Sequence, residues 1–265
     1  MYAPLRMATK YLHYYFTASN GKGHGIHSPF VFEFICEVLN DRRVYEPYAA
    51  IEHQRDALLR DRQELFIRDF GAGSRILRQE TRRVCDIARA SLKQPKFAQL
   101  LFRMVRYYQP ASIIDLGTSL GITTCYLSSA APSAKLYTFE GSDALAEIAR
   151  GIFRALDLRN IELIGGNFEE SLAPVISKLH RIDFAFIDGN HRKEPVLDYF
   201  RKIMERSSRS SIIVIDDIHW STEMEQAWEE IKTDPEIKMT IDLFFAGIVF
   251  RRDEFKVKQH FKIRF

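Results

Sequence analysis

A short apolar run that ends in an acid and continues into a glycine-spaced loop constrains the fold most. Residues 113–121 read Ile-Ile-Asp-Leu-Gly-Thr-Ser-Leu-Gly, and residues 122–130 have the character of a helix. A strand, a tight turn and a helix in this order form the first unit of an open α/β sheet. Glycine lets the backbone turn sharply and approach a ligand, and the first amides of the following helix point toward that ligand. The segment therefore predicts a binding turn at the carboxyl end of a strand.

Strand-like and helix-like segments alternate regularly from residue 111 onward, which predicts a parallel sheet covered on both faces. Two final strand-like runs are joined only by Phe244 and Phe245, too short a link for a helical crossover, so they must pair antiparallel. The predicted fold class is α/β: a doubly wound, Rossmann-like sheet of five parallel strands plus a C-terminal antiparallel hairpin, with an N-terminal helical extension. The expected strands are 112–116, 135–140, 161–164, 183–187, 211–215, 238–243 and 246–251, and the expected helices are 122–130, 143–156, 168–179, 193–206 and 222–232.

Residues 1–94 lack this alternation. Segments 1–18 and 29–39 have the aromatic, amphipathic pattern of helices, with Ser28 as the N-cap of the second one. Segments 50–65 and 80–92 are charged and compatible with helices, and 66–74, with Gly71 and Gly73, is interpreted as a structural loop or as a flap near the active site. The glycines of 21–25 suggest a mobile connection, with His24 and His27 as a metal pair in the alternative. We expect an N-terminal extension over 1–94 and a second domain over 95–265.

Composition sets the broad class of the protein. The 265 residues are 46% hydrophobic, enough for a sizeable core, and the net charge of +3 does not call for a nucleic-acid partner. Cys36, Cys85 and Cys125 show neither disulfide nor metal spacing, which favours a reducing cytoplasm. No apolar run approaches the length of a membrane span, and residues 1–16 lack the apolar core of a signal peptide, so no membrane partner is expected.

The residues that follow the strands resemble a known family. They are Asp115 with its glycine loop after the first strand, Glu140 at the end of the second, 165–168 (Gly-Gly-Asn-Phe) after the third, 186–191 (Phe-Ile-Asp-Gly-Asn-His) after the fourth and 215–220 (Ile-Asp-Asp-Ile-His-Trp) after the fifth. Over about residues 95–251 the chain resembles the class I S-adenosylmethionine-dependent methyltransferases, most closely the metal-dependent small-molecule O-methyltransferases. All these segments lie at the carboxyl ends of strands, where open α/β sheets bind ligands.

The resemblance implies that S-adenosylmethionine is the cofactor. Glu140 follows Asp115 at about the interval of ribose-binding acids in dinucleotide folds, and its carboxylate can accept both ribose hydroxyls. A helix N-cap or a surface acid is the alternative for Glu140. The adenine-side position is commonly aspartate in the family and is Asn167 here, a departure that weakens the match. The implied cofactor-binding residues are Asp115, Gly117, Thr118, Ser119, Gly121, Glu140, Asn167, Phe168 and Asp188.

Three carboxylates form a second group, which the resemblance assigns to a metal. Asp188 follows the fourth strand, and Asp216 and Asp217 follow the fifth. Oxygen ligands without cysteine favour a hard ion such as Mg²⁺, and the matching positions of related O-methyltransferases hold a divalent cation. The third ligand is often asparagine in those relatives, so Asp217 is a departure. A helix-capping Asp188 and a structural acidic pair form the alternative.

His191 stands three residues after Asp188, where catechol-type enzymes carry a lysine and some sugar-methylating relatives a histidine. An unperturbed histidine pKa of ~6.5 suits the removal of a hydroxyl proton at neutral pH. The resemblance therefore implies that His191 and Asp188 are the catalytic residues. His219 and Trp220 either support the metal and wall the acceptor pocket or serve packing alone.

The expected function is methyl transfer from S-adenosylmethionine to a hydroxyl of a small-molecule acceptor, assisted by a divalent cation. Residues 1–94 would cover the acceptor side of the sheet or build a homodimer. One alternative is a nucleic-acid or protein methyltransferase whose substrate docks on basic residues of 75–106 and 256–264. Another is a non-catalytic S-adenosylmethionine-binding module. A dehydrogenase would leave the terminal hairpin and the 188–191 segment unexplained.

Overall fold

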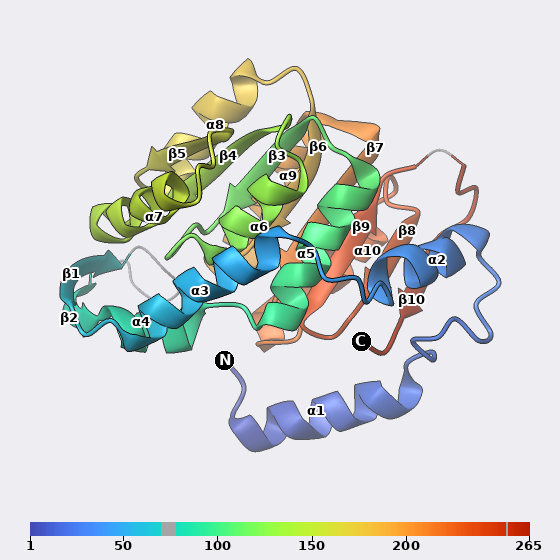
Figure 1. The fold of residues 1–265 in the computed structure, drawn as a ribbon. Helices are drawn as coiled ribbons and strands as arrows, with labels where there is room; N and C mark the ends of the chain where they lie inside the picture. The colour runs from blue at the N-terminus through green and yellow to red at the C-terminus, as the bar shows by residue number, and fades with distance from the viewer. Residues whose placement is uncertain (70–77, 253) are drawn as a thin grey trace. The chain divides into compact units, whose positions relative to one another are not determined.

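The computed structural model describes residues 1–69, 78–252 and 254–265 (Figure 1). The chain divides into two compact units, one of Arg42–Lys178 and one of Met1–Asp41 with Leu179–Phe265. The loop at Gly71 and Gly73 lies outside the described residues.

The unit Arg42–Lys178 contains three parallel strands in the order β3-β4-β5, with bounds Ser112–Leu116, Lys135–Glu140 and Ile161–Gly165. Ile113, Ile114 and Leu116 have no exposed surface, as expected of a parallel strand covered on both faces. The helices of this unit are α3 Pro47–Arg60, α4 Val84–Ser91, α5 Pro95–Tyr108, α6 Ile122–Ala130, α7 Asp143–Ala155 and α8 Phe168–Lys178. The strand and helix predictions from residue 111 to 179 are confirmed to within a residue at most ends.

An antiparallel pair of strands corrects the prediction for the segment before α4. Strands β1 Glu64–Asp69 and β2 Arg78–Arg83 pair in register, whereas a loop was expected over 66–74 and a helix from residue 80. Leu65 and Ile67 are buried and Phe66 is 56% exposed, so β1 has the two-residue period of a half-buried strand. The alternation extends over only three residues, and the charged Arg68 and Asp69 follow it. For this reason the sequence did not predict a strand here.

The other unit contains five strands in the order β10-β8-β9-β7-β6, with bounds Gln259–Lys262, Met239–Asp242, Ala246–Phe250, Ser207–Asp216 and Ile182–Ile187. Strands β6 and β7 are parallel, and β9 runs antiparallel to both β7 and β8. The predicted terminal hairpin is thereby confirmed. Strand β10, which pairs parallel with β8, was not predicted.

The helices of this unit are α1 Pro4–Thr17, α2 Pro29–Phe34, the π-helical turn η1 Ile35–Leu39, α9 Lys193–Glu205 and α10 Thr222–Thr233. The two predicted N-terminal helices are confirmed, and the Ser28 side chain caps the second by accepting from the Val31 N–H at 3.4 Å. Within the described ranges, no helix is long and apolar enough to cross a membrane.

Candidate functional site

The glycine loop after β3 has an unusual backbone. Gly117, Ser119 and Gly121 have φ angles of 112°, 47° and 84°. A Cβ atom on Gly121 would lie 2.8 Å from the Phe153 ring, so only glycine fits there without a shift of its neighbours. The N–H groups of Gly117 and Thr118 both donate to the Phe139 carbonyl, at 3.2 and 2.9 Å. The loop is thus fastened to the end of β4.

Glu140 ends β4 and binds two backbone segments at once. One carboxylate oxygen accepts from the Ser119 N–H at 2.7 Å, and the other accepts from the Ser142 N–H at 2.9 Å. Ser142 is the N-cap residue of α7, so Glu140 links the glycine loop to the start of this helix. A carboxylate oxygen can accept more than one hydrogen bond, so this orientation is compatible with ligand binding.

Asp115 lies fully buried beneath the loop. Its Oδ2 accepts from the hydroxyls of Thr124 and Thr138, at 2.6 and 2.8 Å. Its Oδ1 has no hydrogen-bond partner within the described part of the chain. Burial raises the pKa of Asp115 to about 6 against the opposing effect of the two hydroxyls. Thr118 extends the network, since its hydroxyl lies 2.6 Å from that of Thr138. A buried acceptor without a partner can be satisfied by a donor group of a ligand.

Asn167 and Phe168 follow β5 at the start of α8. The side-chain oxygen of Asn167 accepts from the Glu169 N–H at 3.1 Å, and its carbonyl accepts from the Ser171 N–H at 2.9 Å. Asn167 therefore acts as the cap of this helix, and its side-chain amine remains the group with which it would bind a ligand. The Phe168 ring stands edge-on to Phe139, with ring centroids 6.3 Å apart.

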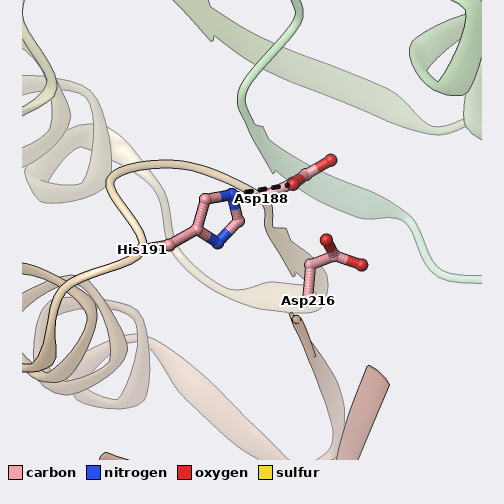
Figure 2. Close-up of side chains that lie close together, drawn as sticks. All are labelled: Asp188, His191 and Asp216. Atoms are coloured by element: carbon pink, nitrogen blue, oxygen red, sulfur yellow. Dashed lines mark ion pairs between the residues drawn. The ribbon is translucent and has the colours of Figure 1, made fainter. Parts of the chain in front are cut away.

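An acidic cluster lies at the carboxyl ends of β6 and β7 (Figure 2). Ile187 pairs with Ile215 in the parallel register, so the residues that follow, Asp188 and Asp216, lie side by side. One potential ligand atom from each of Asp188, His191 and Asp216 lies within 4.8 Å of the others. The His191 Nε2 is 3.6 Å from the Asp188 Oδ1, and Figure 2 shows the imidazole turned toward this carboxylate.

Asp217 is not a member of this three-residue cluster. Its backbone is left-handed, with a φ angle of 53°, and its N–H donates to the Phe245 carbonyl at 2.6 Å. Its role as a metal ligand stays a prediction. His191 is a member of the cluster, so its ring nitrogen is a possible metal ligand. From the sequence, His191 was expected only to transfer a proton.

His219 lies in a network that the sequence analysis did not find. Its Nδ1 is 3.0 Å from a Glu225 oxygen, its Nε2 is 2.9 Å from an Asp242 oxygen, and its ring stacks on Phe244. Burial lowers the pKa of His219, but the hydrogen bonds and charges of Asp242 and Glu225 outweigh this effect and raise it. Lys10 of α1 binds Glu225 at 2.8 Å. His219 thus fastens the loop after β7 to β8 and, through Glu225, to α1.

Residues 114–218 match the protein family described as a methyltransferase domain. The matched range runs from β3 to the loop after β7 and contains Asp115, Glu140, Asp188 and Asp216. The chain contains a methyltransferase domain.

Part of the chain is similar in sequence to proteins that are named as O-methyltransferases. A probable O-methyltransferase of Mycobacterium tuberculosis is 31% identical over 128 residues, which are 45% of this chain and 54% of the relative. A catechol O-methyltransferase of Niastella koreensis is 29% identical over 131 residues, which are 48% of this chain and 57% of the relative. The chain thus spans little more than half the length of each of these relatives.

The fold of the methyltransferase domain also has a counterpart among solved structures. An S-adenosylhomocysteine-bound methyltransferase of Podospora anserina aligns with a TM-score of 0.59 and 13% identity, over 85% of this chain and 97% of the other. At this identity the likeness shows the fold, and the predicted Rossmann-like methyltransferase class is confirmed.

Proposed function

We propose that the protein transfers a methyl group from S-adenosylmethionine to a hydroxyl of a small-molecule acceptor and uses a divalent cation to do so. The observation that carries the proposal is the cluster of Asp188, His191 and Asp216, which follows two adjacent strands inside a methyltransferase domain. Binding of the cofactor at the glycine loop would be compatible with any methyltransferase. The cluster of two carboxylates and a histidine is the feature that favours a hydroxyl acceptor, because it could activate that hydroxyl.

The residues around the glycine loop fit S-adenosylmethionine, which supplies a methyl group on a positively charged sulfur. We assign the ribose hydroxyls to Glu140, because its carboxylate is already oriented by two backbone amides. The free Oδ1 of Asp115 and the loop from Gly117 to Gly121 would bind the methionine portion, which carries a cationic amine. Asn167 and Phe168 would contact the adenine.

The cluster fits a divalent cation by its chemistry. Asp188 and Asp216 offer oxygen ligands, which Mg²⁺ and Mn²⁺ both accept, and an imidazole nitrogen would favour Mn²⁺ over Mg²⁺. A bound cation lowers the pKa of a hydroxyl that coordinates it. Asp217 is the third carboxylate ligand in this proposal. His191 would remove the acceptor proton, and the nearby Asp188 carboxylate, 3.6 Å away, would orient its imidazole.

Radiolabelled methyl transfer to catechols tests the proposal, because one relative is a catechol O-methyltransferase. The assay compares chelator, Mg²⁺ and Mn²⁺. Asp216→Asn should abolish the metal response and lower kcat/KM by about 10²-fold or more while S-adenosylhomocysteine still binds. Asp198→Asn is the matched control, since its side chain is 47% exposed on α9. Full activity in excess chelator would remove the cation from the proposal.

His191→Ala separates the two possible roles of the histidine. As a base, its loss should slow methyl transfer by about 10²–10⁴-fold, with a defect that shrinks as pH rises, and should leave Mn²⁺ affinity unchanged. A large fall in Mn²⁺ affinity would instead make His191 a ligand. An unaltered pH–rate profile would exclude it from proton transfer.

A further inference from the structure

Helix α1 is apolar on two opposite faces. Tyr14 is buried against Phe244 together with Ala18, and Met7 and Tyr11 pack against the same cluster. Spacings of three and four residues place these side chains on one face of the helix. This face anchors α1 to the turn between β8 and β9.

The other face carries large apolar side chains that nothing covers in the described structure. Leu5 is 79%, Leu12 54% and Phe16 78% exposed. The intervals of seven and four residues align them along the helix, opposite the packed face. We call Leu5, Leu12 and Phe16 the exposed stripe. A helix that is apolar on both faces is expected to be covered on both.

The surroundings of the exposed stripe are basic. Residues 1–32 contain no aspartate or glutamate. Arg6 and His13 follow one edge of the stripe in the helical projection, and on the other edge the Arg264 guanidinium lies over the Tyr15 ring at 5.0 Å. The charge of this region therefore favours an anionic partner.

A hollow of about 320 Å³ opens beside the basic edge of α1. It is lined by Thr9, Lys10, His13, Tyr14, His219, Glu225, Phe244 and Lys262. Its one lining carboxylate, Glu225, is bonded to Lys10 and His219, at 2.8 and 3.0 Å. Lys262, which is exposed, supplies a further positive charge at the same hollow, and exposed His13 adds an imidazole N–H that can donate to a phosphate. The hollow has the charge and size to take a phosphate group.

We propose that α1 docks on the surface of a membrane that contains anionic phospholipid. The exposed stripe would enter the boundary between headgroups and acyl chains, and the basic hollow would receive a lipid phosphate. A helix of 14 residues is about 21 Å long, shorter than the hydrocarbon core of ~30 Å, so α1 would lie in the plane of the interface. The sequence predicted no membrane partner on two criteria, spanning length and a signal-peptide core, and neither applies to a helix that lies on the membrane surface.

A second copy of the chain fits this surface less well. Pairing of two α1 helices would bring together segments that carry only positive charge. The face of a helix of this length is also smaller than the ~800 Å² per partner that a stable interface typically buries.

Vesicle flotation of the full-length protein tests the proposal. The protein should float with phosphatidylcholine vesicles that contain phosphatidylglycerol, should not float with phosphatidylcholine alone, and should be released by high salt. Leu12→Ser with Phe16→Ser should lower the bound fraction about tenfold or more, because two apolar side chains are lost from the interface. His13→Gln with Lys262→Gln should weaken binding to anionic vesicles while leaving the stripe intact.

Val44→Ser is the matched control, since Val44 is 88% exposed and lies outside α1. It should float as the wild type does, and all variants should keep their circular dichroism and methyl transfer. Wild-type protein that stays with the soluble fraction at low salt would overturn the proposal. A wild-type dimer that the stripe variant converts to a monomer in light scattering would also overturn it and assign the stripe to a second copy.

Discussion

At the scale of single residues, Glu140 fastens two backbone segments and has a proposed second role in cofactor binding, and two measurements on one variant test these roles. We expect Glu140→Gln to lower the unfolding temperature of the ligand-free protein, because an amide nitrogen cannot accept from a backbone N–H as the carboxylate does. Binding of S-adenosylhomocysteine should weaken by about 1–3 kcal/mol as well. Thermal unfolding and calorimetry measure the two effects. Glu162→Gln, an exposed change on the adjacent strand, is the control. An unchanged unfolding temperature and an unchanged affinity would show that Glu140 is a surface acid that neither stabilises the loop nor binds the cofactor.

Asp115 makes the stability of the protein depend on pH. Its folded pKa of about 6 lies above the pKa of ~3.9 of an unfolded aspartate. As pH rises from about 4 to 6, the unfolded chain loses this proton first, so the free energy of unfolding falls in that window and is flat above it. Asp115→Asn should remove this fall, which is about 2 kcal/mol between pH 4.5 and 7.5 for a pKa raised to about 6. Urea unfolding at pH 4.5 and 7.5 measures it, with Asp56→Asn, 62% exposed, as the control. Parallel pH dependence in wild type and Asp115→Asn would contradict the assignment.

The sequence predicted the acids at strand ends because parallel strands bring such residues to one edge of a sheet. Asp188 and Asp216 are adjacent for that reason. The network of His219 was not predictable in the same way. Its partners Glu225 and Asp242 lie on other elements, and only the folded chain brings them within 3.0 Å of the imidazole.

At the scale of elements, the turn between β8 and β9 holds α1 in place. Phe244 is 2% exposed and contacts the rings of Tyr14 and His219. Phe244→Ala should cost about 3–5 kcal/mol, and hydrogen exchange should rise across α1. Phe245→Ala, in the same turn but 38% exposed, should cost less. Equal effects of the two changes would show that Phe244 does not anchor α1.

The missed strands share a physical cause. Strand β10 has alternating half-buried and exposed residues over only four positions, and all six residues of β2 are polar, three of them arginine. Their stability comes from backbone pairing with a partner that has its own strand signal, such as β8. Hydrophobic periodicity therefore identified the strands that have an apolar run, including the edge strand β5, and missed the strands that lack one.

At the scale of the whole molecule, the two compact units cross the expected boundary at residue 94. Residues 1–41 belong with the C-terminal strands: Phe30 and Phe34 contact Phe250, with ring centroids 4.9 and 5.7 Å apart, and Ser19 pairs with Ile263. Phe34 and Phe250 have no exposed surface. The functional division into 1–94 and 95–265 stays a prediction, but the N-terminal segment is part of a core and not an appendage to one.

Removal of residues 1–40 should therefore damage one unit far more than the other. The truncation uncovers Phe250 on β9, in the unit that carries Asp216, whereas Glu140 keeps its own strands and helices. We expect methyl transfer and Mn²⁺ binding to be lost and solubility to fall, while the S-adenosylhomocysteine affinity of the protein that stays in solution falls by less than about tenfold. Phe34→Ala makes the same test without truncation, because it opens a cavity in the same core and should lower stability by about 3–5 kcal/mol. Calorimetry with Mn²⁺ and with S-adenosylhomocysteine, together with the mass of the protein in solution, measures these effects. A truncated protein with wild-type kinetics would show that residues 1–40 are dispensable, and equal loss of both ligands would show that the units fold as one.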